Sequence, residues 1–444
     1  MAEATSSRPQ REEVASGSRI TKFEIAGLFG LSLNHVVEFP QEATAGRGEP
    51  SLLILSGPNG CGKTTILRMI EGLLELDFNI FRRLPFKHAR LSLSSGEELF
   101  VRTIPDEQFP LLVEFAGITA TLARMQEGPY DPERDRAREV FRKKALPILN
   151  TIHFELLDIH RSLALREVTT EEQQELTPWT NRATPSAAGP RGYPRRARET
   201  QPSSLARRVQ GFIREAQLNY RKYFEAEKLE LLPRILQRLS QRNEIGKAGL
   251  YKKIEDIKAR TPDLTRMGLQ TDELDLDTLM ELLSRKDQFN DPASLAVFEA
   301  YVEMQESRDQ TRELIAKRLA SFEEIMADFL VGKTVQIDAR FGLRINAPTG
   351  SLKETDLSSG EYHFLYMMVA ALLCLRTGSI IAIDEPELSL HVSWQRKVIS
   401  ALARCAAGAS PLFLFATHSA AIAAAHTDRV VRLRSEDSVN ELDS

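Results

Sequence analysis

The fold of this chain follows from one segment, Ser51-Leu-Leu-Ile-Leu-Ser56 followed by Gly57-Pro-Asn-Gly-Cys-Gly-Lys-Thr-Thr65. Its first six residues are mostly apolar and predict a buried strand. The next nine follow the pattern G-x-x-x-x-G-K-[ST], which predicts a phosphate-binding loop that leads into a helix over residues 66–74. In such a loop the backbone N–H groups and the positive end of the helix face an anion. The sequence therefore predicts a nucleoside triphosphate site.

Two side chains of this loop carry specific chemistry. Lys63 is expected to bridge the β- and γ-phosphates, and Thr64 to bind Mg²⁺ through its hydroxyl group. The other loop residues expected to surround the phosphates are Asn59, Gly60, Cys61, Gly62 and Thr65. The alternative, a structural glycine turn without a ligand, is disfavoured because strand and helix patterns flank the loop. We therefore expect ATP and Mg²⁺ as ligands.

Composition limits the class of protein. The chain has 444 residues, of which 42% are hydrophobic, enough to bury more than one core. It contains no apolar run of about 20 residues, and its polar first residues lack the apolar centre of a signal peptide. Its three cysteines have no metal-ligand spacing, which fits a reducing compartment. We expect a cytoplasmic protein without a membrane partner. The net charge of −4 gives no global attraction to nucleic acid.

The order of patterns along the chain predicts an α/β fold. Alternating strands and helices indicate a mostly parallel sheet with helices on both faces. Strands are expected near residues 20–25, 89–93, 98–103, 151–158, 333–337, 342–346, 379–384, 411–416 and 428–433. We expect five segments, which are a flexible tail (1–19), a first lobe with the phosphate loop (20–166), a disordered linker rich in Arg and Pro (167–204), a helical insertion (205–330) and a second lobe (331–444).

The insertion contains two long apolar stripes with helical spacing, over residues 205–239 and 295–329. The stripes could pack as an antiparallel coiled-coil pair. They could equally be ordinary helices of an α domain, because neither stripe sustains a strict heptad. Both interpretations stay open.

The second lobe supplies acids and a histidine at the ends of two predicted strands. In Ser379-Ile-Ile-Ala-Ile-Asp384-Glu385-Pro386, Asp384 can hold Mg²⁺ and Glu385 can polarise the attacking water as a general base. After the next strand, the His418 side chain can hydrogen-bond a γ-phosphate. An accidental acidic pair and a helix-capping Thr-His-Ser are the alternatives. The order of strands favours catalytic roles for Glu385 and His418.

The last motif is Leu357-Ser358-Ser359-Gly360-Glu361, which opens an apolar helix. With the phosphate loop before it and the acidic strand after it, the chain resembles the head of a P-loop ABC-type ATPase. The resemblance implies that Ser358 and the N–H groups near Gly360 contact the γ-phosphate of ATP held by a second copy, so that two copies enclose two nucleotides. Without the resemblance, the motif is a capping box at a helix start.

The sequence departs from that family pattern at several positions. Ser359 and Glu361 stand where transporter subunits have Gly and Gln, and His391 stands where many have the D-loop Asp. The best positional candidate for the γ-phosphate-sensing Gln of the Q-loop is His160.

The segment between Lys63 and Ser358 is much longer than a compact nucleotide-binding subunit needs, which is typical of the SMC, RecF and DNA-repair group. Glu385-Pro-Glu-Leu-Ser-Leu-His391 and Ala416-Thr-His-Ser419 look most like the OLD-like ATPases of bacterial phage-defence systems, including those of PARIS and Septu. That resemblance implies a regulator that holds or releases a separate toxic effector, such as a nuclease, in response to a phage trigger protein. The alternative is a RecF- or SMC-like DNA-binding ATPase of repair or chromosome maintenance. The Arg-rich residues 182–208 could contact DNA or an acidic effector, or could be a passive linker.

Overall fold

The computed structural model describes residues 18–40, 51–106, 110–123, 132–158, 205–218, 233, 235–236, 247–269, 276–284, 292–376, 378–409 and 411–433. Nearly all of the predicted tail, the predicted linker and His160 lie outside these residues. The chain divides into two compact units. The first comprises Met1–Ile159, Cys374–Ile399 and Ala409–Ser444, and the second comprises His160–Leu373 and Ser400–Gly408.

The first unit contains a five-stranded sheet whose strands are all parallel, in the order β14-β3-β13-β12-β8. Its strands are β3 (Ser51–Ser56), β8 (Phe154–Leu157), β12 (Ile380–Asp384), β13 (Leu412–Thr417) and β14 (Val430–Arg432). In β12 all five side chains are buried, and in β13 five of six are. Continuous apolar runs of this kind are typical of parallel strands covered on both faces. The parallel sheet expected from the sequence is confirmed.

A second sheet of this unit has six antiparallel strands in the order β2-β1-β4-β5-β6-β7. Its strands are β1 (Ile20–Ala26), β2 (Asn34–Glu38), β4 (His88–Leu93), β5 (Glu98–Thr103), β6 (Leu111–Phe115) and β7 (Ile118–Leu122). The sequence predicted the strands β1, β4 and β5, but the prediction that strands are mostly parallel holds only for the first sheet.

The unpredicted hairpin β6–β7 turns at Ala116-Gly117, where both residues have positive φ, 48° and 77°. A two-residue turn of this kind connects antiparallel strands tightly. Its usual signal is Asn-Gly or Asp-Gly, and Ala at the first position hides the turn in the sequence.

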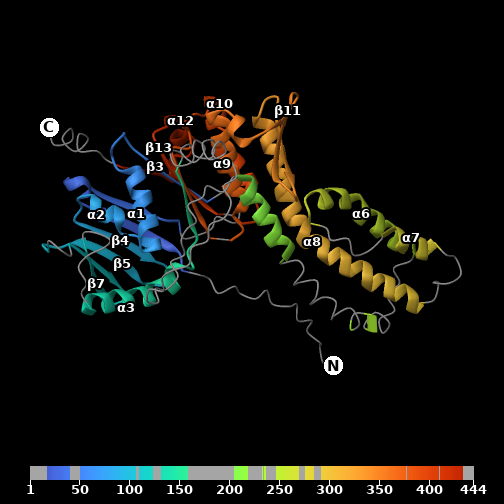
Figure 1. Cartoon of the computed structure of the whole chain (residues 1–444), viewed down its shortest axis with the longest axis horizontal. Coiled ribbons are helices and arrows are strands. Elements are labelled where there is room, and N and C mark those ends of the chain that lie inside the picture. Colours follow the sequence, from blue (N-terminus) through green and yellow to red (C-terminus); the bar gives the residue numbers. More distant parts are fainter. Residues whose placement is uncertain are drawn as a thin grey trace, which may run out of the picture. The chain divides into compact units, whose positions relative to one another are not determined.

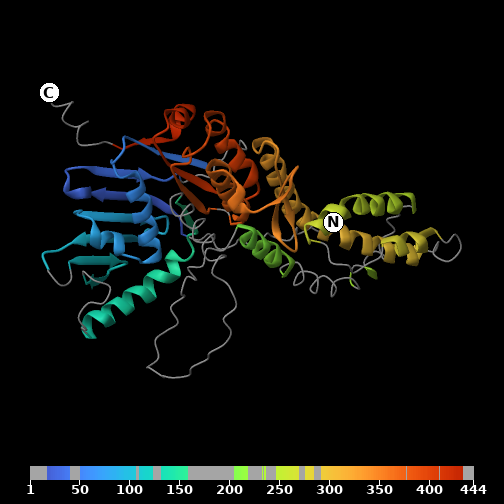
Figure 2. The same cartoon turned by 45° about the horizontal axis from the view of Figure 1, so that its top comes forward.

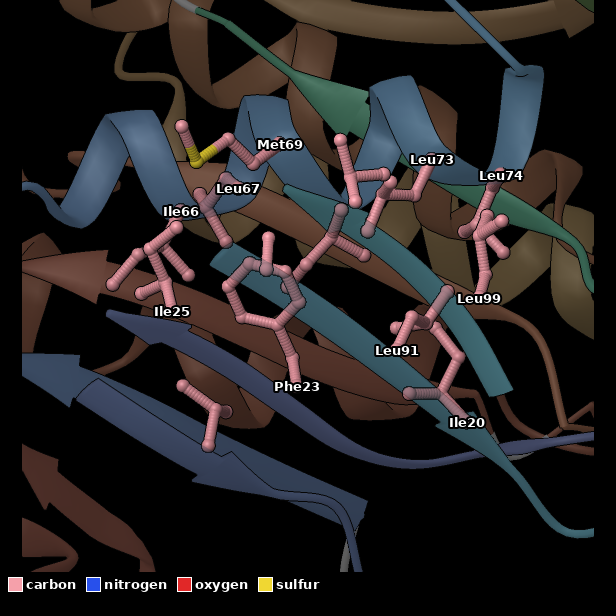
Figure 3. Packing of buried hydrophobic residues seen from close by; sticks show 14 of the residues in the cluster. Ile20, Phe23, Ile25, Ile66, Leu67, Met69, Leu73, Leu74, Leu91 and Leu99 are labelled. Carbon is pink, nitrogen blue, oxygen red and sulfur yellow. The ribbon is translucent and has the colours of Figure 1, made fainter. Parts of the chain in front are cut away.

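The helix that follows the phosphate loop, α1 (Lys63–Glu75), lies in the hydrophobic core of the first unit. Figure 3 shows Ile66, Leu67 and Leu73 of α1 facing Phe23 and Leu91 of the antiparallel sheet. The same core cluster includes side chains of β3, β12 and β13. Because one apolar cluster joins α1 to strands of both sheets, it fixes the start of α1 against the parallel sheet.

Phe23 is among the largest fully buried side chains of the protein and lies in this core cluster. We expect Phe23→Ala to lower the free energy of unfolding by roughly 3–5 kcal/mol, because the substitution removes buried surface and leaves a cavity. Val36 on neighbouring β2 is 44% exposed, and Val36→Ala should change the free energy of unfolding by less than about 0.5 kcal/mol. Urea unfolding followed by circular dichroism compares the two variants. Equal effects would contradict the assignment of this core.

The remaining elements of the first unit are one long helix and several short helices. Helix α3 (Pro132–Leu149) packs on β7, and Figure 2 shows it in green beside the antiparallel sheet. The short ones are α2 (Asn79–Arg83), α10 (Val392–Gln395), α12 (Ala420–Ala425), η1 (Leu28–Gly30) and η3 (Thr427–Arg429). Loops before α10 and α12 carry residues of the candidate site.

The second unit is built around α8 (Pro292–Phe329), a helix of 38 residues that contains the second apolar stripe. Figure 1 shows α6 (Lys247–Arg266) and α7 (Leu276–Ser284) beside it. Their shared core includes Leu250 and Ile254 of α6, Leu283 of α7, and Phe298 and Val302 of α8. Within the described residues, this half of the stripe packs on α6 and α7, and the coiled-coil pairing of the two stripes stays a prediction.

The other end of α8 packs on α9 (Ser359–Leu373). The Arg318 guanidinium donates to the carbonyl oxygens of Ala371 and Leu372 at the end of α9, at 3.0 and 2.9 Å. Phe329 stacks on Phe364 with ring centroids 4.1 Å apart. The helix that begins within the predicted signature motif is therefore held by the long helix of the insertion.

A small antiparallel sheet, β11-β10-β9, follows α8. Its strands are β9 (Thr334–Asp338), β10 (Gly342–Ala347) and β11 (Gly350–Leu352). The helices η2 (Glu354–Asp356) and α11 (Val398–Cys405) come later in the chain. Within the described part of the chain, none of the helices combines the length and apolar character that crossing a bilayer requires.

Candidate functional site

Three parallel strands bring the predicted site residues to one edge of the five-stranded sheet. In the registers of these strands, Thr417 of β13 pairs with Ser56 of β3, and Asp384 of β12 pairs with Ala416. The three strands therefore end at almost the same level. Loops that leave the carboxyl ends of parallel strands meet at one edge, which is where α/β folds build their sites. The phosphate loop, the acidic pair and the Thr-His-Ser segment share this edge.

The phosphate loop has the backbone that the glycine pattern predicted. Gly62 precedes α1 with φ of 98°, a conformation that side chains rarely adopt. A Cβ atom at this position would lie 2.6 Å from Leu28 Cδ2, so only glycine fits. Lys63 is buried, and its Nζ donates to the carbonyl oxygens of Gly57 and Pro58 at 2.8 and 2.9 Å. The loop therefore curls around the lysine ammonium at the positive end of α1.

The loop is joined directly to the acidic strand end. Thr64 Oγ1 donates to Asp384 Oδ1 at 3.0 Å. These two oxygens come from segments 320 positions apart. Neutral and charged oxygen ligands at one point are the donor set that Mg²⁺ prefers.

Another carboxylate lies near Asp384. Asp158 directly follows β8 and is buried, and it pairs with Arg68 of α1 at 2.6 Å. Burial raises the pKa of Asp384, and the Glu385 and Asp158 carboxylates raise it further, against the hydrogen bond from Thr64. The edge of the sheet therefore concentrates negative charge that a cation would relieve.

We expect Asp384→Asn to raise the melting temperature of the nucleotide-free protein at pH 7. A raised folded-state pKa means that the folded state holds this proton more tightly than the unfolded state. Stability is therefore lost as the pH rises from the ordinary value of 3.8 through the folded pKa, and the neutral amide avoids this loss. Differential scanning fluorimetry from pH 4 to pH 8 measures the melting temperatures of both proteins. A lower melting temperature for Asp384→Asn than for the unmodified protein at pH 7 would contradict the raised pKa of Asp384.

Glu385 and His418 face each other across the loops that leave β12 and β13. Glu385 has a positive φ of 51°, and its backbone N–H donates to Ala416 O at 2.8 Å. Its Oε1 lies 3.8 Å from His418 Nδ1. A left-handed backbone costs a non-glycine residue about 1–2 kcal/mol and is commonest where function requires a particular side-chain direction.

A buried carboxylate that the sequence did not single out lies behind this histidine. Glu387 is 6% exposed, and its Oε1 is 3.2 Å from His418 Nδ1. The signal for Glu387 is present in the sequence, because Glu-Pro-Glu places two acids after one strand. The signal for Asp158 is its place directly after β8, next to Leu157, which pairs with the neighbour of Asp384, Ile383.

The predicted signature residues lie in the second unit, at the start of α9. Ser358 is exposed and Gly360 is buried. Ser358 Oγ accepts from Glu361 N at 3.3 Å, and Glu361 Oε2 accepts from Ser358 N at 2.8 Å, which is a capping box. Burial would raise the pKa of Glu361, but hydrogen bonds from Lys333 and Ser358 lower it overall. The motif thus opens α9 as expected, with its serine at the surface.

The structure brings together Lys63, Thr64, Asp384, Glu385 and His418 in the first unit. The loop residues Asn59, Gly60, Cys61, Gly62 and Thr65 surround the same α1 terminus. His160 lies outside the described residues. His391, at the predicted D-loop position, caps α10 through Nδ1, which accepts from Ser393 N at 3.3 Å.

A family model described as "AAA domain, putative AbiEii toxin, Type IV TA system" matches residues 52–424. No curated protein matches the chain. Among solved structures, the chain is similar to the Smc head domain of Pyrococcus furiosus with an extended coiled coil, bound to the C-terminal domain of ScpA. The two are 13% identical with a TM-score of 0.42, over 96% of this chain and 99% of that one.

Two further solved structures are similar at this level. One is the SmcHead bound to the C-winged helix domain of ScpA, with 13% identity and a TM-score of 0.37 over 91% of this chain and 92% of that one. The other is the Smc head domain of Pyrococcus yayanosii with a coiled coil and joint, with 14% identity and a TM-score of 0.36 over 95% of this chain and 96% of that one.

Proposed function

This chain belongs to the AAA_21 family of AAA domains, and we propose that it binds ATP with Mg²⁺ and hydrolyses it to ADP and phosphate. The site is the edge of the five-stranded sheet. The observation that carries the proposal is the 3.0 Å hydrogen bond from Thr64 Oγ1 to Asp384 Oδ1. It joins the phosphate loop to the acidic strand end, the two halves that hydrolysis of a triphosphate requires.

The phosphate loop binds the triphosphate in this proposal. Lys63 exchanges the carbonyl oxygens of Gly57 and Pro58 for β- and γ-phosphate oxygens, and the N–H groups at the start of α1 bind the β-phosphate. Mg²⁺ held by Thr64 and Asp384 would neutralise charge on the phosphates. His160 remains the candidate sensor of the γ-phosphate.

Catalysis is assigned to Glu385 with help from His418. Glu385 lies one residue after the proposed metal ligand Asp384, so its carboxylate can accept a proton from the attacking water. His418 lies on the adjacent loop and can hydrogen-bond the γ-phosphate as the bond breaks. The held backbone of Glu385 supports a fixed direction for this carboxylate.

A second copy of the chain completes the site in this proposal. Ser358 is exposed at the start of α9, a helix of 15 residues whose first N–H groups carry partial positive charge. Its hydroxyl accepts in the capping box and can still donate to a γ-phosphate oxygen. Two copies would then enclose two ATP molecules, each bound by the loop of one copy and the α9 start of the other.

We assign to this ATPase the role of a cytoplasmic regulator in bacterial phage defence. It would hold or release a separately encoded effector, such as a nuclease, when a phage trigger protein acts on it. The family description, which names a toxin–antitoxin system, supports a role in an assembly of more than one component. The contacts of α8 with α9 supply a route by which closure around ATP can move the insertion.

The test has two parts. Purified protein should release phosphate from ATP with Mg²⁺ and stop when EDTA is added, and tagged protein should retain the product of an adjacent gene in an ATP-dependent manner. Absence of hydrolysis would contradict the ATPase assignment. Hydrolysis that is stimulated by duplex DNA, with salt-dependent DNA binding and no retained protein, would instead support the RecF- or SMC-like alternative.

A further inference from the structure

Glu387 joins the two loops that carry the proposed catalytic residues. Its Oε1 accepts from Thr417 Oγ1 at 2.6 Å and from the backbone N–H groups of His418 and Ser419 at 3.0 and 3.1 Å. Its Oε2 is also buried and has no hydrogen-bond partner among the described residues. Since the donors all point at Oε1, this oxygen serves as an acceptor in a fixed position.

The His418 ring lies against the same oxygen. Its Nδ1 is 3.2 Å from Glu387 Oε1 and 3.8 Å from Glu385 Oε1, while the side chain as a whole is 46% exposed. Both carboxylates are therefore on the Nδ1 side of the ring. An acceptor fixed 3.2 Å from Nδ1 favours the tautomer that carries its hydrogen on that nitrogen. Nε2 is then the ring nitrogen that remains for a phosphate oxygen.

A second residue strengthens the connection between the loops. Gln395 of α10 donates through Nε2 to the carbonyl oxygens of Glu387 and Leu390, at 3.4 and 3.1 Å. Its Oε1 accepts from Ser419 Oγ at 3.3 Å. The loop after β12 and the loop after β13 therefore form one hydrogen-bonded unit, which fixes the backbone of His418 with respect to the loop that carries Glu385.

We propose that Glu387 is the positioning residue of His418, which it orients with Nδ1 inward and Nε2 toward the γ-phosphate. This inference rests on the proposed ATPase function. It goes beyond a helix-capping role, because capping uses only the backbone N–H groups of His418 and Ser419. The contact of Oε1 with the imidazole ring adds a catalytic consequence, since a buried carboxylate that orients a histidine also stabilises positive charge on it.

The test is Glu387→Gln, whose carbonyl oxygen can keep the backbone hydrogen bonds while the negative charge is lost. We expect kcat for ATP hydrolysis to fall about 10–100-fold, as for other residues that orient a catalytic ligand. KM for ATP should change less than about 3-fold, since Lys63 and α1 bind the phosphates. Glu24→Gln is the matched control, because Glu24 is an acid of the same unit that pairs with Lys22 on β1.

A double-mutant cycle separates positioning from a general structural effect. Rates are measured with enzyme in excess over ATP, so that slow variants remain measurable. If Glu387 acts through the ring, Glu387→Gln should lower the rate less than about 2-fold in the His418→Ala background. An equal loss in both backgrounds, or an unchanged kcat in the single variant, would overturn the proposal.

A spectroscopic measurement is independent of hydrolysis. In ¹⁵N-histidine-labelled full-length protein, the His418 signals are identified by their absence in His418→Ala. We expect a hydrogen on Nδ1 of His418, and a ring that carries its hydrogen only on Nε2 would overturn the proposal. An enzyme with the expected Nδ1 hydrogen but no hydrolysis would refute the ATPase assignment and leave the positioning of His418 standing.

Discussion

Replacing Glu385 with Gln is expected to lower kcat for ATP hydrolysis by about 10²–10⁴-fold, the usual contribution of a general base. The amide is close in size to the carboxylate but cannot accept the proton of the attacking water. ATP binding should be retained, because Lys63 and the start of α1 hold the phosphates. Phosphate release and ATP affinity, measured on the same preparation, separate the two effects.

The acid-to-amide control for this variant is Glu24→Gln, which should leave kcat unchanged. Glu24 lies on β1 of the antiparallel sheet, where it pairs with Lys22 at 2.8 Å, whereas Asp384 lies on β12 of the parallel sheet. A Glu385→Gln protein that hydrolyses ATP at the unmodified rate would remove Glu385 from the mechanism.

Lys63→Ala is expected to weaken the binding of ATP. A hydrogen bond to a charged group contributes about 1.5–3 kcal/mol, so ATP should bind roughly 10–150-fold more weakly. Lys63 is buried and already bound by the carbonyl oxygens of its own loop, so its ammonium is held where the phosphates would lie. Titration with a fluorescent ATP analogue measures the change.

Lys22→Ala serves as the control for Lys63→Ala, because Lys22 is a partly exposed lysine on β1 that pairs with Glu24. Its removal should leave the affinity for ATP unchanged. Equal affinities of the Lys63→Ala and Lys22→Ala proteins would contradict the assignment of residues 57–65 as the triphosphate site.

The parallel part of the fold was predictable because local sequence and long-range pairing agree there. The runs at β3, β12 and β13 are short, apolar and followed by loop residues, and each became a strand of one sheet. The antiparallel sheet was only half predicted. Its hairpin β6–β7 turns at Ala116-Gly117, whose conformation a sequence without Asn or Asp does not signal.

The residues of the candidate site also fall into a predictable group and an unpredictable one. Motif residues such as Lys63, Thr64 and Asp384 could be named because their spacing from a strand fixes their place. Asp158 and Glu387 could not be assigned, because their roles depend on partners from other segments, Arg68 for one and His418 for the other. Such pairs become visible only when the strand order is known.

Two copies are expected to share ATP, with Lys63 of one copy and Ser358 of the other at the same triphosphate. Light scattering measures the mass in solution of the Glu385→Gln protein with Mg²⁺ and ATP. We predict that this protein has the mass of two copies with ATP and of one copy with ADP. The double variant Glu385→Gln, Ser358→Arg should still bind ATP but have the mass of one copy. Single copies under every condition, with ATP bound, would contradict the claim.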